Sequence, residues 1–395
     1  MVLRDNAANM VAAFTDDSGM PSAGCLSHSL QLVIKSDLLG LPSVEKLIQK
    51  VKNVVSFANH SDKFYVEFRK QQKIQMEDGK ELNLIQDVVT RWNSTFYMLE
   101  RFLKLKNPLI SSMAWSEDIK VEFRNEDWKL LDKVVTVLKC FEEATKRLSC
   151  KSASISLTIP IVTIIIKQLE TGKNDFGVKT LKRDLRDAME VRFGDIEDQD
   201  KYTLSTFLDC RFKGLLYRKK ETLKNVKQKL IHLIMEELEK SNLESDQNMN
   251  VEMEEGAVFH TGDLSVNSKA KDIFETTMEG IIQRSSQKMS TEFEVTQFVE
   301  QYANSKVIES LDEKESFDQV LQYWKSMESS MKPIDKVAAK LANHYLTPPA
   351  TSVDVERLFS TAGDIRTQER NRLTGENAGQ ILFLKENLPR INFEY

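Results

Sequence analysis

The sequence lacks the features that mark several classes of protein. Its four cysteines, Cys25, Cys140, Cys150 and Cys210, form no CxxC pair. This spacing argues against disulfide staples and a four-ligand zinc site, and it indicates a reducing compartment. Lys and Arg number 55 against 60 Asp and Glu, a net charge of -5. That balance argues against clamping of nucleic acid through bulk charge.

Long apolar runs and a secretory leader are also missing. The nearest approach to a membrane span, residues 156–169, is short, contains Pro160 and has polar flanks, so we expect a buried helix there. The first residues show no signal-peptide pattern. We therefore expect a soluble intracellular protein with no membrane partner.

The remaining composition is that of a folded chain, with 395 residues, 41% of them apolar and 29% charged. Val2 and Leu3 read as the end of a short strand, and residues 7–14 as the helix that follows it. Apolar periodicity predicts further helices, the clearest of them over residues 126–149, 155–171, 178–193, 219–240, 269–283, 292–304 and 334–346.

Three segments lack this helical pattern. Residues 204–215 read as a loop rich in polar and aromatic residues, and the segment just before Arg91 has a short strand-like start. Residues 241–268 contain six acidic residues but no Lys or Arg. They have few apolar side chains, which predicts a flexible acidic linker.

Glu356 stands out among the carboxylates. On a helix, its face is made of small residues, Ser352, Ser360 and Gly363, which leave room for a metal ion and a substrate phosphate. The alternative is an ordinary helix glutamate that pairs with Arg357 or water. Asp5, at the end of the predicted strand, is either a ligand-site carboxylate or a helix N-cap.

Two residue pairs carry similar alternatives. Cys25 and His28 share one helix face, and a buried thiol beside a hydrogen-bonded imidazole is favoured over a zinc site, which needs four ligands. Arg91 and Trp92 lie at a strand-to-helix corner. They either contact DNA, by phosphate binding and base stacking, or the Trp packs under the first turn of the helix.

Read in order, the segments RDNAANMVAAF, CLSHSLQLVI, VVTRWNSTFYMLER, FLDCRFK, YLTPPATSVDVERLFSTAGDI and RNRLTGENAGQILFLKEN resemble the hAT superfamily of DNA transposases. More closely, they are similar to the zinc-finger BED-type proteins derived from those transposases. The resemblance spans nearly the whole chain and is most specific over residues 341–388, which match the family's C-terminal dimerisation region.

The resemblance implies a fold and a set of domains. We expect an α+β, mostly α, protein with a partial ribonuclease-H-like core that lacks its first strands and is interrupted by a large all-helical insertion. The expected parts are a partial core (1–105), a helical insertion (106–240), an acidic linker (241–268), a helical segment (269–332) and the dimerisation region that completes the core (333–395).

The resemblance also implies roles for single residues. Asp5 and Glu356 correspond to two of the three acidic residues that bind the divalent metals used in DNA cleavage. Cys25 with His28 corresponds to a structural pair, and Arg91 with Trp92 lies near the DNA. The first aspartate of the triad would lie upstream of Asp5. We therefore expect no catalysis from this chain, and Mg²⁺ or Mn²⁺ only where that aspartate exists.

The functional expectation is a domesticated or degenerate transposase remnant in the nucleus. It would act through homodimers, or heterodimers with a related protein, in DNA-associated or transcriptional regulation, and DNA binding would need an upstream finger. The helix around residue 383 is apolar on most sides and needs a covering surface. The expected dimerisation residues are Leu358, Phe359, Ile381, Phe383, Leu384 and Leu388. The alternative is the C-terminal part of an active metal-dependent transposase.

Overall fold

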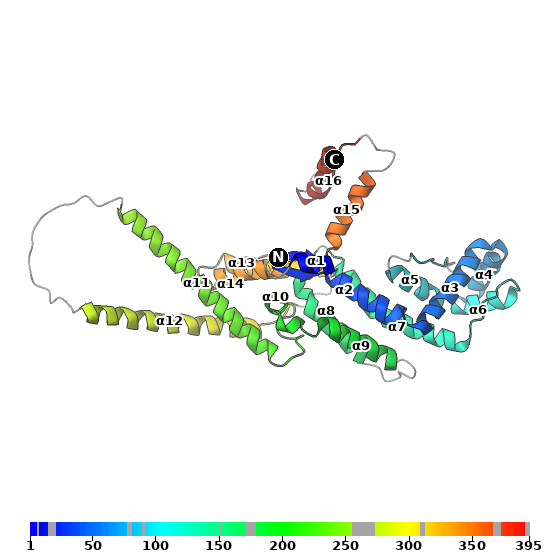
Figure 1. The fold of residues 1–395 in the computed structure, drawn as a ribbon, viewed down its shortest axis with the longest axis horizontal. Coiled ribbons are helices and arrows are strands. Elements are labelled where there is room, and N and C mark those ends of the chain that lie inside the picture. Colours follow the sequence, from blue (N-terminus) through cyan, green and yellow to red (C-terminus); the bar gives the residue numbers. More distant parts are fainter. Residues whose placement is uncertain are drawn as a thin grey trace, which may run out of the picture. The chain divides into compact units, whose positions relative to one another are not determined.

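The computed structural model describes residues 1–5, 8–14, 21–76, 81–88, 92–150, 152–170, 179–254, 273–308, 313–365 and 373–391 (Figure 1). The chain divides into two compact units, which we consider separately. Unit 1 comprises Met1–Ala153, Ile161–Gly194 and Pro349–Tyr395, and unit 2 comprises Ser154–Pro160 and Asp195–Pro348. In both units the described residues are predominantly helical, as the sequence predicted.

Unit 1 contains one small sheet among its helices. Strands β1 (Val2–Arg4) and β2 (Ser22–Gly24) pair in parallel, with Val2 opposite Ser22. The helices are α1 (Ala8–Ala13), α2 (Leu26–Ile34), η2 (Lys35–Leu39), α3 (Pro42–His60), α4 (Asp62–Gln75), α5 (Trp92–Lys104), α6 (Lys106–Trp115), α7 (Asn125–Leu148), α9 (Lys179–Phe193), α15 (Val353–Ile365), α16 (Gly375–Asn387) and η6 (Leu388–Ile391). Helix α8 (Thr158–Glu170) begins in unit 2 and continues in unit 1.

The core of unit 1 forms where the amphipathic faces of α2, α3, α5 and α7 meet. Along α7, the buried residues recur every three or four positions, as a one-faced helix requires. The Phe102 ring of α5 stacks on the Trp128 ring of α7 with centroids 5.4 Å apart. This packing joins residues on both sides of position 105, so the predicted boundary between core and insertion is not a boundary between the two units.

Unit 2 is all helical in its described residues. It contains η3 (Ile155–Leu157), η4 (Ile196–Asp198), α10 (Asp200–Leu208), α11 (Thr222–Glu254), α12 (Ile273–Asn304), α13 (Glu313–Glu328) and α14 (Pro333–Leu346). Helix α10 is buried from Tyr202 to Leu208. Two ring side chains from α12 and α13 bond to its last carbonyls: Tyr302 Oη donates to Phe207 O at 3.0 Å, and Trp324 Nε1 donates to Leu208 O at 2.9 Å.

A buried charge cluster follows α10. The Asp209 carboxylate is fully buried and accepts bonds from the Arg211 guanidinium (2.8 and 2.9 Å) and from Ser156 Oγ (2.7 Å). Lys213, two residues after Arg211, has a φ of 47°, in the left-handed region. Its Nζ donates to the carbonyl and to the hydroxyl of Ser305, both at 2.6 Å. Burial lowers the pKa of this lysine. The cluster thus fixes the chain after α10 to η3 and to the end of α12.

Several expectations from the sequence need correction. Residues 204–215 are not all loop, because α10 extends to Leu208. Several polar residues of this helix are buried, so its sequence lacks the apolar period that predicts a helix. Residues 241–254 belong to α11 rather than to a linker, while 255–268 lie outside the described residues. The two helices predicted over 269–304 are one helix in their described part. Residues 81–88 contain no strand.

The structure also bears on membrane association. Within the described ranges, no helix has both the length and the apolar character that crossing a bilayer requires. The apolar helix α8 is 13 residues long.

The Asp209 cluster predicts a large effect on stability. Asp209→Ala leaves the buried Arg211 guanidinium without its carboxylate, so we expect it to lower the free energy of unfolding of unit 2 by about 3–5 kcal/mol. Urea unfolding followed by far-UV circular dichroism measures this loss. As a control, Asp354→Ala removes the carboxylate of an exposed ion pair with Arg357 and should leave the transition almost unchanged. Equal effects of the two substitutions would contradict the assignment.

Candidate functional site

The beginning of α15 lies at a junction of chain segments that are far apart in the sequence. The Cys25 N–H, at the start of α2, donates to Arg4 O at the end of β1 (2.7 Å). The next amide, Leu26 N–H, donates to Ala350 O (3.1 Å), just before α15. Main-chain bonds therefore bring β1, α2 and the segment before α15 together within unit 1.

Side chains continue this junction into α15. Cys25 is 1% exposed, and its sulfur lies 3.4 Å from both the amide nitrogen and the hydroxyl of Ser352. The same hydroxyl lies 3.0 Å from Glu356 Oε1. A serine has one hydroxyl proton, and a carboxylate is a stronger acceptor than a thiol, so the hydroxyl donates to Glu356. The Cys25 thiol can then donate to the Ser352 oxygen.

The first turn of α15 is also bonded to the end of α7. Thr351 Oγ1 donates to Leu148 O (3.2 Å), and Arg357 Nη2 donates to Ser149 O (2.6 Å). A second guanidinium nitrogen of Arg357 donates to Asp354 Oδ1 at 3.1 Å. Arg357 thus pairs with Asp354 and not with Glu356, in contrast to the alternative raised from the sequence.

The two acidic residues that the resemblance singled out both belong to this junction. Asp5 directly follows Arg4, whose carbonyl accepts from Cys25, and Glu356 is linked to Cys25 through Ser352. Asp5 is half-buried, whereas Glu356 is exposed. In the described part of the chain, no group of three or more His, Cys, Asp or Glu side chains is placed to hold a metal ion.

Of the two predicted pairs, only Cys25 contacts the junction at the start of α15 among the described residues. His28 is half-buried in the first turn of α2, while the sulfur of Cys25 contacts Ser352. Arg91 lies outside the described residues. Trp92 is 4% exposed and packs at the start of α5. Stacking on a base needs an exposed ring face, so this conformation corresponds to the packing alternative.

Cys140 and Cys210 are not activated nucleophiles. Burial raises the pKa of the Cys140 and Cys210 thiols to about 12 each, with desolvation as the largest cause. A thiol with such a pKa stays protonated near neutral pH, and the thiolate is the reactive form. These side chains therefore behave as small apolar core residues.

An exposed apolar surface lies on α15 and α16, which pack side by side (Figure 1). No residue of α16 is buried, and on α15 Ile365 is the buried one. Phe359 is 70% exposed and Phe383 66% exposed. Ile381 and Leu384 are also exposed, whereas Leu358 and Leu388 are half-buried. The exposed Val355, one turn before Phe359, belongs to the same surface and was missing from the expected set, although its spacing indicated it.

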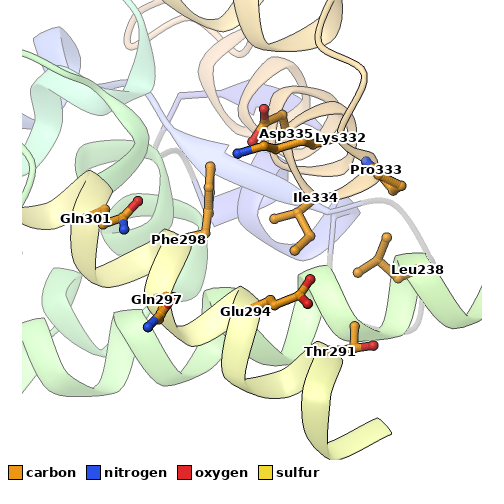
Figure 2. A pocket seen from close by; sticks show the side chains of 10 residues that line it. All are labelled: Leu238, Thr291, Glu294, Gln297, Phe298, Gln301, Lys332, Pro333, Ile334 and Asp335. Carbon is orange, nitrogen blue, oxygen red and sulfur yellow. The ribbon is translucent and has the colours of Figure 1, made fainter. Parts of the chain in front are cut away.

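A pocket of about 520 Å³ in unit 2 offers a second candidate (Figure 2). It lies between α11, α12 and the start of α14, where Lys332 and Asp335 face Glu294 and Phe298 across the opening. The residues that line it include neither cysteine nor histidine. Its lining is mixed polar and apolar without a paired nucleophile and base, so it does not indicate a catalytic centre.

The Ser352 contacts can be tested through the reactivity of Cys25. Ser352→Ala removes the hydroxyl that joins the thiol to Glu356, so the first turn of α15 should open more often and Cys25 should react faster with a thiol reagent. We expect a roughly fivefold increase, since one lost hydrogen bond corresponds to about 1 kcal/mol. Mass spectrometry of labelled peptides separates Cys25 from half-buried Cys150, the internal reference. Ser360→Ala, farther along α15, should leave the Cys25 rate unchanged.

Models of known protein families match two segments of the chain. Residues 23–137 match the ZBED1 RNase-like helical domain, a segment that runs from the end of β2 to the middle of α7. Residues 298–388 match the hAT family C-terminal dimerisation region, which includes α13 to α16. The exposed apolar surface of α15 and α16 therefore lies inside a region matched as a dimerisation region.

Individual proteins with similar sequences belong to the same groups as the matched family models. The whole chain aligns with the human zinc finger BED domain-containing protein 4 at 27% identity and with the human zinc finger BED domain-containing protein 6 at 24%. It spans 31% and 40% of the lengths of these two relatives. A Zea mays protein named as an AC transposase is 29% identical over 37% of this chain and 18% of its own. The chain is thus similar over its whole length to zinc finger BED domain-containing proteins, and it contains segments that match the ZBED1 RNase-like helical domain and the hAT family C-terminal dimerisation region.

Proposed function

We propose that this chain is a dimerising part of a domesticated or degenerate hAT transposase remnant that acts in DNA-associated or transcriptional regulation, without catalysis of its own. One observation carries the proposal: the helices α15 and α16 expose their large apolar side chains, and they lie in the segment matched as a dimerisation region.

The physical argument concerns the cost of that exposure. Apolar surface gains roughly 25 cal/mol for each Å² removed from water. Phe359 and Phe383 are rigid and large, and side chains of this kind provide much of the binding energy at protein interfaces when they become buried. A second copy of the chain offers the same apolar surface, so a homodimer covers both at once. A heterodimer with a related protein uses the same helices.

The proposed link to DNA rests on the similarity to longer zinc finger proteins and not on the charge of this chain. Unit 1 contains 35 Lys and Arg against 32 Asp and Glu, and unit 2 contains 20 against 28. Neither balance provides the strongly basic surface that phosphate binding by charge alone requires. The named relatives are zinc finger proteins and are longer than this chain. We propose that an upstream finger supplies the DNA contact and that the protein works in the nucleus.

The proposed lack of catalysis rests on the acidic residues of the junction. Two-metal cleavage of DNA needs carboxylates that converge on ions about 3.5–4 Å apart. Asp5 and Glu356 are two carboxylates, one fewer than the three that the resemblance implies, and the exposed Glu356 already accepts a bond from Ser352. We therefore derive no metal-dependent step for this chain. The alternative, a part of an active transposase, requires a further aspartate from a longer product.

The dimerisation surface can be tested by introducing charge. Ile381→Asp with Leu384→Asp places two carboxylates in the apolar surface of α16, and burying them against a second copy is unfavourable. We expect the variant to sediment as a monomer at concentrations where the native chain is a dimer. Its helical circular dichroism should be nearly unchanged, because neither side chain is buried within the chain.

A matched control introduces the same charges elsewhere. Val191→Asp with Met331→Asp changes two exposed apolar residues outside α15 and α16 and should leave the dimer intact. A persistent dimer in the α16 variant would place the interface elsewhere on the chain.

Catalysis can be tested directly. We expect the chain to produce no nicks in hairpin or terminal-repeat DNA in the presence of Mg²⁺ or Mn²⁺, because two acidic residues hold the metals too weakly. Gel electrophoresis of end-labelled DNA measures the products. Cleavage that disappears in Glu356→Gln would instead support the transposase alternative and give Glu356 a catalytic role.

A further inference from the structure

Two glycines occupy unusual positions on the exposed surface of α15 and α16. Gly363 lies within α15 and Gly379 within α16, and both are exposed. Glycine in the interior of a helix is destabilising relative to alanine, because the unfolded chain loses more conformational freedom on folding. A glycine at such a position therefore calls for a local physical reason.

Gly40, Gly194 and Gly214, in contrast, each have such a reason in their own surroundings. A Cβ added at Gly40 would lie 2.9 Å from Ser36 O, and one at Gly194 would lie 2.6 Å from Glu190 O. At Gly214 an added Cβ would lie 2.5 Å from Cδ1 of Leu223. At these three positions a side chain would collide with neighbouring atoms of the same chain.

No such reason exists at Gly363 or Gly379 within the described structure. A Cβ built at either position has no neighbouring heavy atom within 4 Å, and neither glycine has a φ in the left-handed region. The described part of the chain thus accepts alanine at both sites. The space above the two glycines is open, and the fold of the single chain does not require it.

Each open position lies beside an exposed phenylalanine. Phe359 comes four residues before Gly363 on α15, and Phe383 comes four residues after Gly379 on α16, so each pair shares one helix face. Each helix thus presents a bulky exposed ring next to a position that has no side chain. In a two-fold dimer the same two features of a second copy meet this surface, so a ring of one copy can lie over a glycine of the other.

We infer that Gly363 and Gly379 are the points of close helix approach in the dimer, where the exposed phenylalanines of a second copy pack over the glycine backbone. This inference rests on the proposed dimerisation and adds its geometry. The partner is a second copy of this chain because the exposed rings and the open glycine positions lie on the same two helices inside the matched dimerisation region.

Alanine substitutions separate this role from a merely local one. Gly363→Ala and Gly379→Ala each add one methyl group at an open position, and they favour the helix in the single chain. If a second copy packs there, the added methyl group crowds the contact, and the dimer dissociation constant should rise on the order of tenfold for each substitution. Sedimentation velocity over a dilution series measures that constant, and circular dichroism should show equal or greater thermal stability of the monomer.

A control substitution on α15 tests whether the effect depends on the glycine positions. Ser360→Ala on α15 raises helix propensity without adding volume and should leave the dissociation constant unchanged. Combining Gly379→Ala with Phe383→Ala should cost less than the sum of the two single effects, because both act on one contact. A native dimer whose constant is unchanged or lower in the glycine variants overturns this inference alone. A native chain that stays monomeric overturns the proposed dimerisation as well.

Discussion

The attachment of α15 by its first turn is the constraint on which the rest of this arrangement depends. Polar groups that are buried away from water must find partners, and around α15 these partners come from β1, α2 and the end of α7. The Cys25 thiol, the Ser352 hydroxyl and the carbonyls of Leu148 and Ser149 meet there. After this turn the helix has little within the described chain to pack against, apart from α16.

The first turn of α15 is held by bonds within the chain, whereas the later turns expose apolar side chains. This arrangement suits a helix whose exposed face is covered by another molecule. Bonds to the junction determine where α15 begins, so a partner meets a surface that is already oriented and loses less conformational freedom on binding. The exposed rings of Phe359 and Phe383 supply the apolar area, and the open space at Gly363 and Gly379 supplies the shape. In unit 2, the buried Asp209 cluster fixes the chain after α10 in a comparable way, but there the helices are covered by their own neighbours.

The position of Glu356 relates the proposed loss of catalysis to the proposed dimer interface. Its carboxylate lies one turn into α15 and accepts the Ser352 hydroxyl, so it contributes to the start of the helix that carries Phe359. A residue that helps to hold this turn is useful even where no metal binds. The ancestry implied by the resemblance and the structural role of the residue are therefore compatible.

The sequence by itself determined the elements whose signals are local. Helices α7, α9 and α14 begin and end within two residues of their predicted bounds, because an amphipathic period needs no information from distant segments. The sequence also indicated that the helix around residue 383, α16, is apolar on most sides and needs a covering surface. Tertiary structure alone decided the short strand β2, which exists by pairing with β1, and the buried helix α10, whose residues show no one-sided period because all its faces are covered. It also decided the contact of Cys25 with Ser352, since the two residues are 327 positions apart and only packing brings them together.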